Sequence, residues 1–341
     1  MPSAEPIRVG GPYFEDFEVG QIYDAPALTL TSGHAAIHQA LVGDRMLMPL
    51  DATLSAAVTG RPEPLAHPNL VCDVAIGQST TPTQRVRGNL FYRGLVLLRP
   101  VFIGDTLRTR TEIVGLRQNR PRADGSATGL VALRIRTENQ DGERVLDFWR
   151  CPMIPLRDAS AQTGHADRFE DIPAELDMDR VASAVPGDWS FGAMRDRTGG
   201  GAFAGLEVGT AYAIEGRDTV TAAPELVRLT LNVAETHVDA ESNAFGRRLV
   251  YGGHTISVAA AQLTRALPGV MTIVAWRECN HTAPVFEGDR LSTVVSVEAT
   301  HALGHTDGAG LVDLRALVAA EREGTEGGQP VLDWRLLALM S

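Results

Sequence analysis

Lysine is absent from the 341-residue sequence, so all 31 side chains counted as Lys or Arg are arginines. Without a lysine amine, the chain cannot form a Schiff base with a substrate carbonyl, and it cannot contain the lysine of a phosphate-binding P-loop. Any anionic ligand would therefore have to be bound by arginine side chains or by backbone N–H groups.

Cysteine is scarce as well. The three cysteines, Cys72, Cys151 and Cys279, are odd in number and far apart. We therefore expect packed thiols rather than a disulfide framework or a Cys-x-x-Cys metal site. Spacings such as His-Glu-x-x-His are missing, and no Gly-x-Gly-x-x-Gly follows a strand, so we expect neither a metal nor a redox cofactor.

Long apolar runs are also missing. The longest, such as residues 95–98, are far shorter than the roughly 20 residues that span a bilayer. The first residues, MPSAEPIRVGG, contain no apolar stretch typical of a secretion signal, which predicts a cytoplasmic location and no membrane partner. The net charge of −11 disfavours binding to nucleic acid.

The most informative feature that is present is an internal repeat. Five short segments of the first half recur in the same order in the second half, offset by about 181–189 residues. Five matches in series indicate a duplication, and the length also favours two domains. The matched segments begin at Phe14 and Phe203, Leu65 and Leu249, Pro100 and Pro284, Gly129 and Gly310, and Val145 and Val331; in the last, residues 145–150 match residues 331–335.

The repeat divides the chain into a domain over residues 1–156, a linker over residues 157–200 and a domain over residues 201–341. The linker is rich in Asp, Gly and Pro, with one short helix expected around residues 174–184.

Each repeat has one strong apolar helix followed by strand-like runs. This order predicts an α+β fold in which a curved antiparallel sheet wraps a central helix, and two such sheets pair edge to edge, as in a tandem (double) hot-dog. We expect the helices at residues 69–77 and 254–266, and strands of the first repeat at 107–114, 130–137 and 145–154, with a turn at 139–142.

The segment ahead of the second apolar helix resembles a motif of the MaoC-like hydratases, Gly-Asp-x-Asn-Pro-x-His-x-Asp. His237 falls on the motif's histidine, and Asn232 stands where the catalytic aspartate would be. In the first repeat Asp44 matches that aspartate, whereas Pro49 replaces the histidine. The resemblance implies that an acid/base pair activates a water, which adds to the double bond of an enoyl thioester.

This departure from the motif leaves two catalytic arrangements open. In the first, His237 is the acid/base and Asn232 orients the water, because an amide can form hydrogen bonds but cannot carry the proton. In the second, Asp44 and His237 form a composite pair across the two domains.

Five more residues are candidates for substrate binding. The double glycine Gly252-Gly253 at the start of the second helix would let a thioester oxygen approach backbone N–H groups and the positive end of the helix dipole. His254, in the first turn, would line the same pocket. Arg247 and Arg248 would pair with coenzyme A phosphates or a substrate carboxylate. Further candidates for these roles are Arg85, Arg87 and Arg93, and His281 is a candidate pocket residue.

Residues 70–95, 99–114 and 247–268 resemble the fused MaoC-like family that includes mesaconyl-CoA (2-methylfumaryl-CoA) hydratase. This resemblance covers nearly the whole chain. It implies reversible hydration of a carboxylate-bearing enoyl-CoA to β-methylmalyl-CoA, with coenzyme A entering as part of the substrate. An arginine must then bind the free carboxylate, and the identity of that arginine stays open at this point. Related folds also suggest a homodimer.

Two other functions are weighed against hydration. Tyr251-Gly252-Gly253-His254 is similar to the helix start of some hot-dog acyl-CoA thioesterases. The incomplete motifs would also suit a noncatalytic acyl-CoA binding protein.

Overall fold

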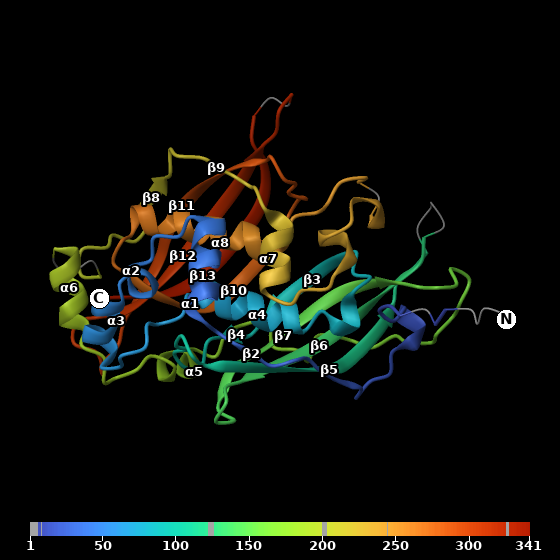
Figure 1. Cartoon of the computed structure of the whole chain (residues 1–341), viewed down its shortest axis with the longest axis horizontal. Helices are drawn as coiled ribbons and strands as arrows, with labels where there is room; N and C mark the ends of the chain where they lie inside the picture. The colour runs from blue at the N-terminus through green and yellow to red at the C-terminus, as the bar shows by residue number, and fades with distance from the viewer. Residues whose placement is uncertain (1–5, 8, 122–125, 200–202, 244, 325–326) are drawn as a thin grey trace.

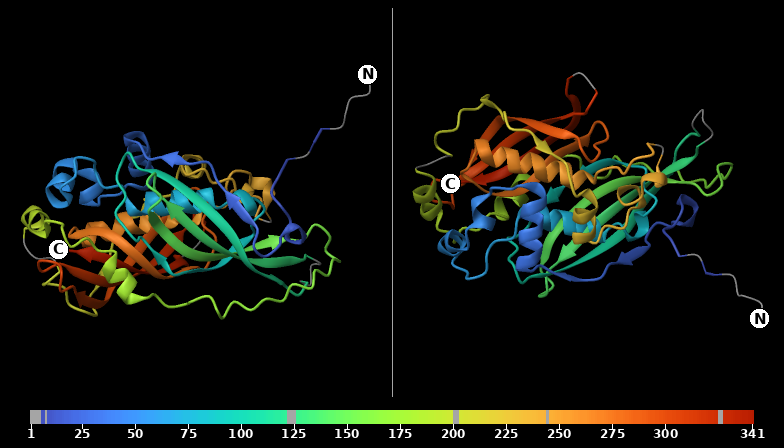
Figure 2. Two further views of the ribbon diagram at one scale, coloured as in Figure 1. Left: turned by 90° about the horizontal axis from the view of Figure 1, so that it is seen from below. Right: turned by 45° about the horizontal axis from the view of Figure 1, so that its top comes forward.

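The computed structural model describes residues 6–7, 9–121, 126–199, 203–243, 245–324 and 327–341. The chain folds into two antiparallel sheets, one from each half, with a central helix packed against each (Figure 1). The two halves lie side by side when the molecule is viewed from either direction in Figure 2. The α+β architecture expected from the repeat is confirmed.

The first sheet contains the three long strands that the sequence predicts, each slightly longer than expected. The turn predicted at residues 139–142 closes with a hydrogen bond from the Gly142 N–H to the Asn139 carbonyl. The strand order is β1 (Ile22–Asp24), β5 (Thr106–Gln118), β6 (Thr128–Glu138), β7 (Arg144–Pro155) and β3 (Gly88–Arg93), with β2 (Leu28–Thr29) paired to β5.

The second sheet repeats this arrangement and borrows one strand from the first half. Its order is β4 (Leu95–Val96), β10 (Val270–His281), β13 (Gln329–Met340), β12 (Gly310–Glu321), β11 (Arg290–Ala302) and β8 (Ala211–Ala213), with β9 (Asp218–Thr219) paired to β11.

The two sheets meet along the segment that runs from β3 into β4. Leu95 and Val96 pair with Trp276 and Ala275 of β10 in the second sheet. Directly after them, Leu97 bridges to Leu146 of β7 in the first sheet. One stretch of backbone therefore pairs with an edge strand of each sheet, and this pairing joins the two sheets edge to edge as predicted.

The two central helices are α4 (Pro68–Gln78) and α8 (Gly252–Ala266), which contain the helices predicted from apolar spacing. Every residue of α4 is buried, because sheet, partner helix and connecting segments surround it. Gly77 is required there: a Cβ at this position would lie 1.9 Å from the carbonyl oxygen of Thr230. The close approach brings the end of α4 against the chain that leads to the second-repeat motif.

Shorter helices cover the ends of the sheets. They are α1 (Ser32–Val42), α2 (Leu47–Leu50), α3 (Ala52–Thr59) and α7 (Ala223–Leu229), with 3₁₀ turns at Phe14–Asp16, Thr81–Thr83, Glu235–His237 and Ala240–Ser242.

The linker is packed against the second sheet rather than loose. The short helix expected in it is present as α5 (Met178–Ser183), and a second one, α6 (Phe191–Thr198), was not predicted. Phe191 and Met194 of α6 are buried in a cluster that also contains Met48 and Leu339. The proposed boundary between residues 200 and 201 lies outside the described residues.

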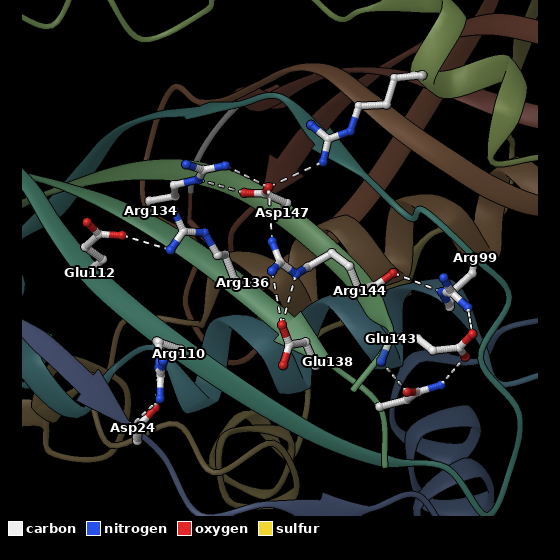
Figure 3. Close-up of polar contacts among 12 residues, drawn as sticks. Asp24, Arg99, Arg110, Glu112, Arg134, Arg136, Glu138, Glu143, Arg144 and Asp147 are labelled. Atoms are coloured by element: carbon white, nitrogen blue, oxygen red, sulfur yellow. Dashed lines mark hydrogen bonds and ion pairs between the residues drawn. The ribbon is translucent and has the colours of Figure 1, made fainter. Parts of the chain in front are cut away.

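The outer face of the first sheet carries a network of arginine–carboxylate ion pairs (Figure 3). Arg134 lies 3.0 Å from Asp147 on the neighbouring strand, and Arg136 lies 2.9 Å from Glu112. Because these arginines remain partly exposed, each pair adds little stability.

Cys72, Cys151 and Cys279 are all buried free thiols, as expected. Over the part of the chain that the structure describes, none of the helices combines the length and apolar character needed to cross a bilayer.

Candidate active site between the two halves

A cavity of about 350 Å³ opens where the two halves meet. The first half contributes the end of α4 and the inner faces of β3 and β7. The second half contributes the motif segment, the start of α8 and the end of β10. Its walls include Thr80, Asn89, Tyr92, Arg150, Asn232, His237, Tyr251, Gly252 and His281.

His237 lies in this wall, and a backbone carbonyl holds its imidazole ring. Its Nδ1 is 2.8 Å from the carbonyl oxygen of Leu249. A carbonyl oxygen only accepts hydrogen bonds, so Nδ1 carries the proton and Nε2 carries the free lone pair. Burial lowers the pKa of His237 to about 4, despite the Leu249 carbonyl, which favours the protonated form. At neutral pH the imidazole is therefore an uncharged base.

Asn232 is brought into the same cavity wall, as the first catalytic arrangement requires. Its Oδ1 accepts a hydrogen bond of 2.9 Å from the Ala234 N–H, which fixes the amide orientation. The Nδ2 group is then the donor end. Such an amide can hold a water or a substrate oxygen but cannot remove a proton from it.

Asp44 lies elsewhere, outside the cavity wall. Its carboxylate accepts from the Met46 N–H at 2.8 Å and lies 3.1 Å from His67 Nε2. Burial alone would raise the pKa of Asp44, but the His67 and Met46 contacts lower it overall. Asp44 thus has its own buried partner in the first half, and the structure does not bring it together with His237.

The two central helices begin differently. In α4, the Asn69 N–H is capped by His67 Nδ1 at 3.1 Å. In α8, the cap residue Tyr251 makes no side-chain cap bond. The first N–H groups of a helix have no partner inside it. The His254 N–H donates to the Tyr251 carbonyl at 2.9 Å, so the backbone donor that α8 offers at the cavity wall is the Gly252 N–H.

The double glycine is explained mainly by packing. A Cβ on Gly252 would lie 2.6 Å from His281 Nε2, and one on Gly253 would lie 1.9 Å from Asp73 Oδ1. Only Gly252 belongs to the cavity wall. The predicted contact between Gly252 and a ligand is therefore compatible with the geometry, whereas Gly253 serves the contact between α8 and α4.

The other predicted binding residues lie outside the cavity wall. His254 is fully buried. Arg248 pairs with Glu287 at 2.6 Å, and the Arg247 guanidinium stacks on Phe286 at 4.4 Å.

Among the further arginine candidates, Arg87 contributes to the cavity and to an adjoining hollow that Arg85 also lines, whereas Arg93 stacks on Phe91 away from both.

The sequence interpretation missed Arg150, Tyr92 and Asn89, and gave His281 only a minor place. His281 lies in the cavity wall, within electrostatic reach of His237. Arg150 had one signal: it stands two residues after Phe148 in an otherwise apolar strand face. Among the described residues, no three histidine, cysteine or acidic side chains are grouped to hold a metal ion.

Known proteins resemble this chain over most of its length. The sequence profile described as mesaconyl-CoA hydratase matches residues 4–323. The chain is 30% identical to the mesaconyl-CoA hydratase of Cereibacter sphaeroides, over 93% of this chain and 91% of that protein. It is likewise 30% identical to the beta-methylmalyl-CoA dehydratase of Chloroflexus aurantiacus, over 97% of both chains.

Among solved structures, Rv0216 of Mycobacterium tuberculosis, a conserved hypothetical protein with a double hot-dog fold, is 47% identical. The match covers 98% of this chain and 100% of Rv0216, with a TM-score of 0.88. The tandem hot-dog prediction is thereby confirmed, and the chain belongs to the mesaconyl-CoA hydratase family.

Proposed function

We propose that the chain catalyses the reversible hydration of an enoyl-CoA thioester, with mesaconyl-CoA and β-methylmalyl-CoA as the substrate pair. The observation that supports this most directly is the neutral imidazole of His237 in the cavity wall, beside the uncapped start of α8. Relatives that carry the names mesaconyl-CoA hydratase and beta-methylmalyl-CoA dehydratase support the choice of substrate.

The reaction needs one proton shuttle. The water oxygen forms a bond to the β-carbon while His237 Nε2 takes one of the water's protons. The π electrons move toward the thioester, whose oxygen becomes an enolate stabilised by the N–H group and dipole at Gly252. The His237 imidazolium then returns the proton to the α-carbon. One water is added in total, and the imidazole ends uncharged.

Asn232 holds the attacking water in this scheme. Its fixed orientation, set by the Ala234 N–H, would leave the Nδ2 donors to bind the water or the product hydroxyl. Because the amide takes no proton, His237 carries both proton transfers alone. We keep this arrangement over the Asp44–His237 pair because Asp44 is engaged by His67.

Coenzyme A enters as part of the substrate, and we propose no other cofactor and no metal. Arg87, which lines both the cavity and the adjoining hollow, is the arginine best placed to meet the pantetheine-phosphate end. A cytoplasmic location and a homodimer remain our predictions; light scattering on the purified chain tests the second.

The test is incubation of the purified chain with mesaconyl-CoA, followed by product mass spectrometry and a thiol assay. Hydration adds the mass of one water without releasing thiol. Release of free coenzyme A would instead indicate the thioesterase, in which water attacks the carbonyl carbon. Tight binding of acyl-CoA without turnover on any enoyl-CoA would indicate the noncatalytic binding protein.

A further inference from the structure

Arg150 is a buried arginine in the wall of the candidate active site. Its side chain reaches from β7 under the end of α4 and is only 4% exposed. One terminal nitrogen donates to the carbonyl oxygen of Ser79 at 2.9 Å and to Thr83 Oγ1 at 2.8 Å. The Nε–H is buried and has no hydrogen-bond partner among the described residues. The guanidinium is thus anchored through one terminal nitrogen but not fully hydrogen-bonded.

No described carboxylate forms an ion pair with Arg150. This sets it apart from the arginines on the outer face of the same sheet: Arg134 and Arg144, for example, both pair with Asp147 (Figure 3). Partial negative charge at the end of α4 stabilises the cation in part. A buried charge without a counter-ion nevertheless costs free energy, which an anionic ligand group would offset.

The duplicated strand shows that the fold itself does not require this arginine. Phe148 and Arg150 share the buried inner face of β7, and on β13 the inner face carries Trp334 and Leu336. The strand alternation therefore matches Arg150 with Leu336. Arg335, one position earlier on β13, points to the outer face, where it pairs with a glutamate.

Arg150 also lies within electrostatic reach of the proposed acid/base. Its positive charge contributes, after burial, to lowering the pKa of His237. Burial raises the pKa values of Tyr92 and Tyr251, and the positive charge of Arg150 opposes this increase. All four side chains line one cavity, so the cation and the base can engage the same small substrate.

We propose that Arg150 binds the free carboxylate of the substrate and thereby selects dicarboxylic enoyl-CoA thioesters over monocarboxylic ones. This rests on the proposed function and names the arginine that function requires. In mesaconyl-CoA the carboxylate is attached to the β-carbon that receives the water. A fork of N–H donors at Arg150 would hold that end beside His237, while the thioester oxygen lies at Gly252.

The test compares two substrates that differ only at this group. Tiglyl-CoA has the carbon skeleton of mesaconyl-CoA with a methyl in place of the carboxylate. In Arg150→Met, we expect kcat/KM for mesaconyl-CoA to fall by about 10- to 100-fold, the usual range for a hydrogen bond to a charged group. The value for tiglyl-CoA should change little or rise. An equal fall for both substrates would mean a purely structural role and would overturn the proposal.

Binding provides a readout that does not depend on turnover. Succinyl-CoA and butyryl-CoA differ in the same way and have no double bond to hydrate. The wild-type chain should bind succinyl-CoA more tightly, and Arg150→Met should remove that preference. A wild type with no such preference would overturn the proposal even if hydration is observed. If the wild type prefers succinyl-CoA but hydrates no enoyl-CoA, the carboxylate site is supported and the proposed function is rejected.

Two further variants control for folding. Arg335→Met removes an arginine that lies on the matching strand, outside the cavity. It should leave unchanged the ratio of kcat/KM for mesaconyl-CoA to that for tiglyl-CoA, and the ratio of the affinities for succinyl-CoA and butyryl-CoA. If circular dichroism shows that Arg150→Met does not fold, Arg150→Lys replaces it in both assays. Lysine keeps the charge but loses the planar fork, so the preference for the carboxylate should shrink. A preference equal to that of the wild type would contradict the proposal.

Discussion

The Nδ1 atom of His237 lies 2.8 Å from the carbonyl oxygen of Leu249. The backbone N–H of Leu249 donates in turn to the carbonyl oxygen of Thr236 at 3.0 Å. This two-way link joins the motif segment to the chain that enters α8. It sets the tautomer of the imidazole and its position in the cavity wall together.

Replacing His237 with alanine should remove the proton shuttle without emptying the site. We expect kcat for hydration to fall by about 10²- to 10⁴-fold, the range for general acid–base catalysis. The affinity for succinyl-CoA, measured by calorimetry, should change little. His165→Gln alters a histidine outside the cavity and is the matched control. A loss of affinity as large as the loss of kcat would argue against the acid/base role.

Asn232→Asp should restore the carboxylate that the motif carries in MaoC-like hydratases. A negative charge next to His237 stabilises the imidazolium, so the pKa of the imidazole should rise. We therefore expect the acidic limb of the pH profile of kcat/KM to move to higher pH, while Asn232→Ala should lower the rate without that displacement. An unchanged limb in Asn232→Asp would show that the two side chains do not share a water.

The folded chain should lose stability on mild acidification. Burial lowers the pKa values of His237 and His254 to about 4, from 6.5 in an unfolded chain. Because the unfolded state binds these protons first, their stabilising effect is complete above about pH 6.5 and is lost as the pH falls toward 4.

Urea unfolding at pH 7, 6 and 5 measures this effect. Each histidine adds a slope of at most about 1.4 kcal/mol per pH unit. In His254→Gln the slope should be shallower than in the wild type. A free energy of unfolding that is the same at pH 7 and pH 5 would contradict the prediction.

Gly253→Ala should destabilise the contact between the two central helices. The new Cβ would overlap Asp73 Oδ1 and the Tyr251 ring, which lie 1.9 and 2.3 Å from its ideal position. Overpacking of this kind costs about 1–3 kcal/mol, which a thermal melt detects as a lower Tm. Gly304→Ala, where a Cβ meets nothing within 4 Å, is the control. Equal melting temperatures for the two variants would rule out the packing explanation.

Arg87→Ala should weaken binding of the coenzyme A portion. Its guanidinium donates to the Ser242 carbonyl at 2.7 Å at the rim of the cavity, where it remains exposed to a phosphate. We expect KM for the acyl-CoA to rise several-fold with kcat nearly unchanged, and the effect to shrink at high salt. The exposed Arg168→Ala is the control. A KM independent of both substitution and salt would place the phosphates elsewhere.

The sequence by itself determined the duplication, the two central helices and the long strands of the first sheet. These follow from apolar spacing and turn residues, which act over a few neighbouring positions. It also selected His237 and Asn232, because both lie in one short motif, and the structure brings them into one cavity wall.

Only the tertiary structure decided which groups meet. Asp44 matches the motif's aspartate and Asn232 does not, yet Asp44 lies against His67, the cap residue of α4, and Asn232 lies in the cavity wall. Arg150 follows Phe148 by two residues, but its place in the cavity wall depends on which face of β7 is turned inward. Contacts between segments far apart in the chain, and the choice of face that they impose, are set by packing and cannot be obtained from local spacing.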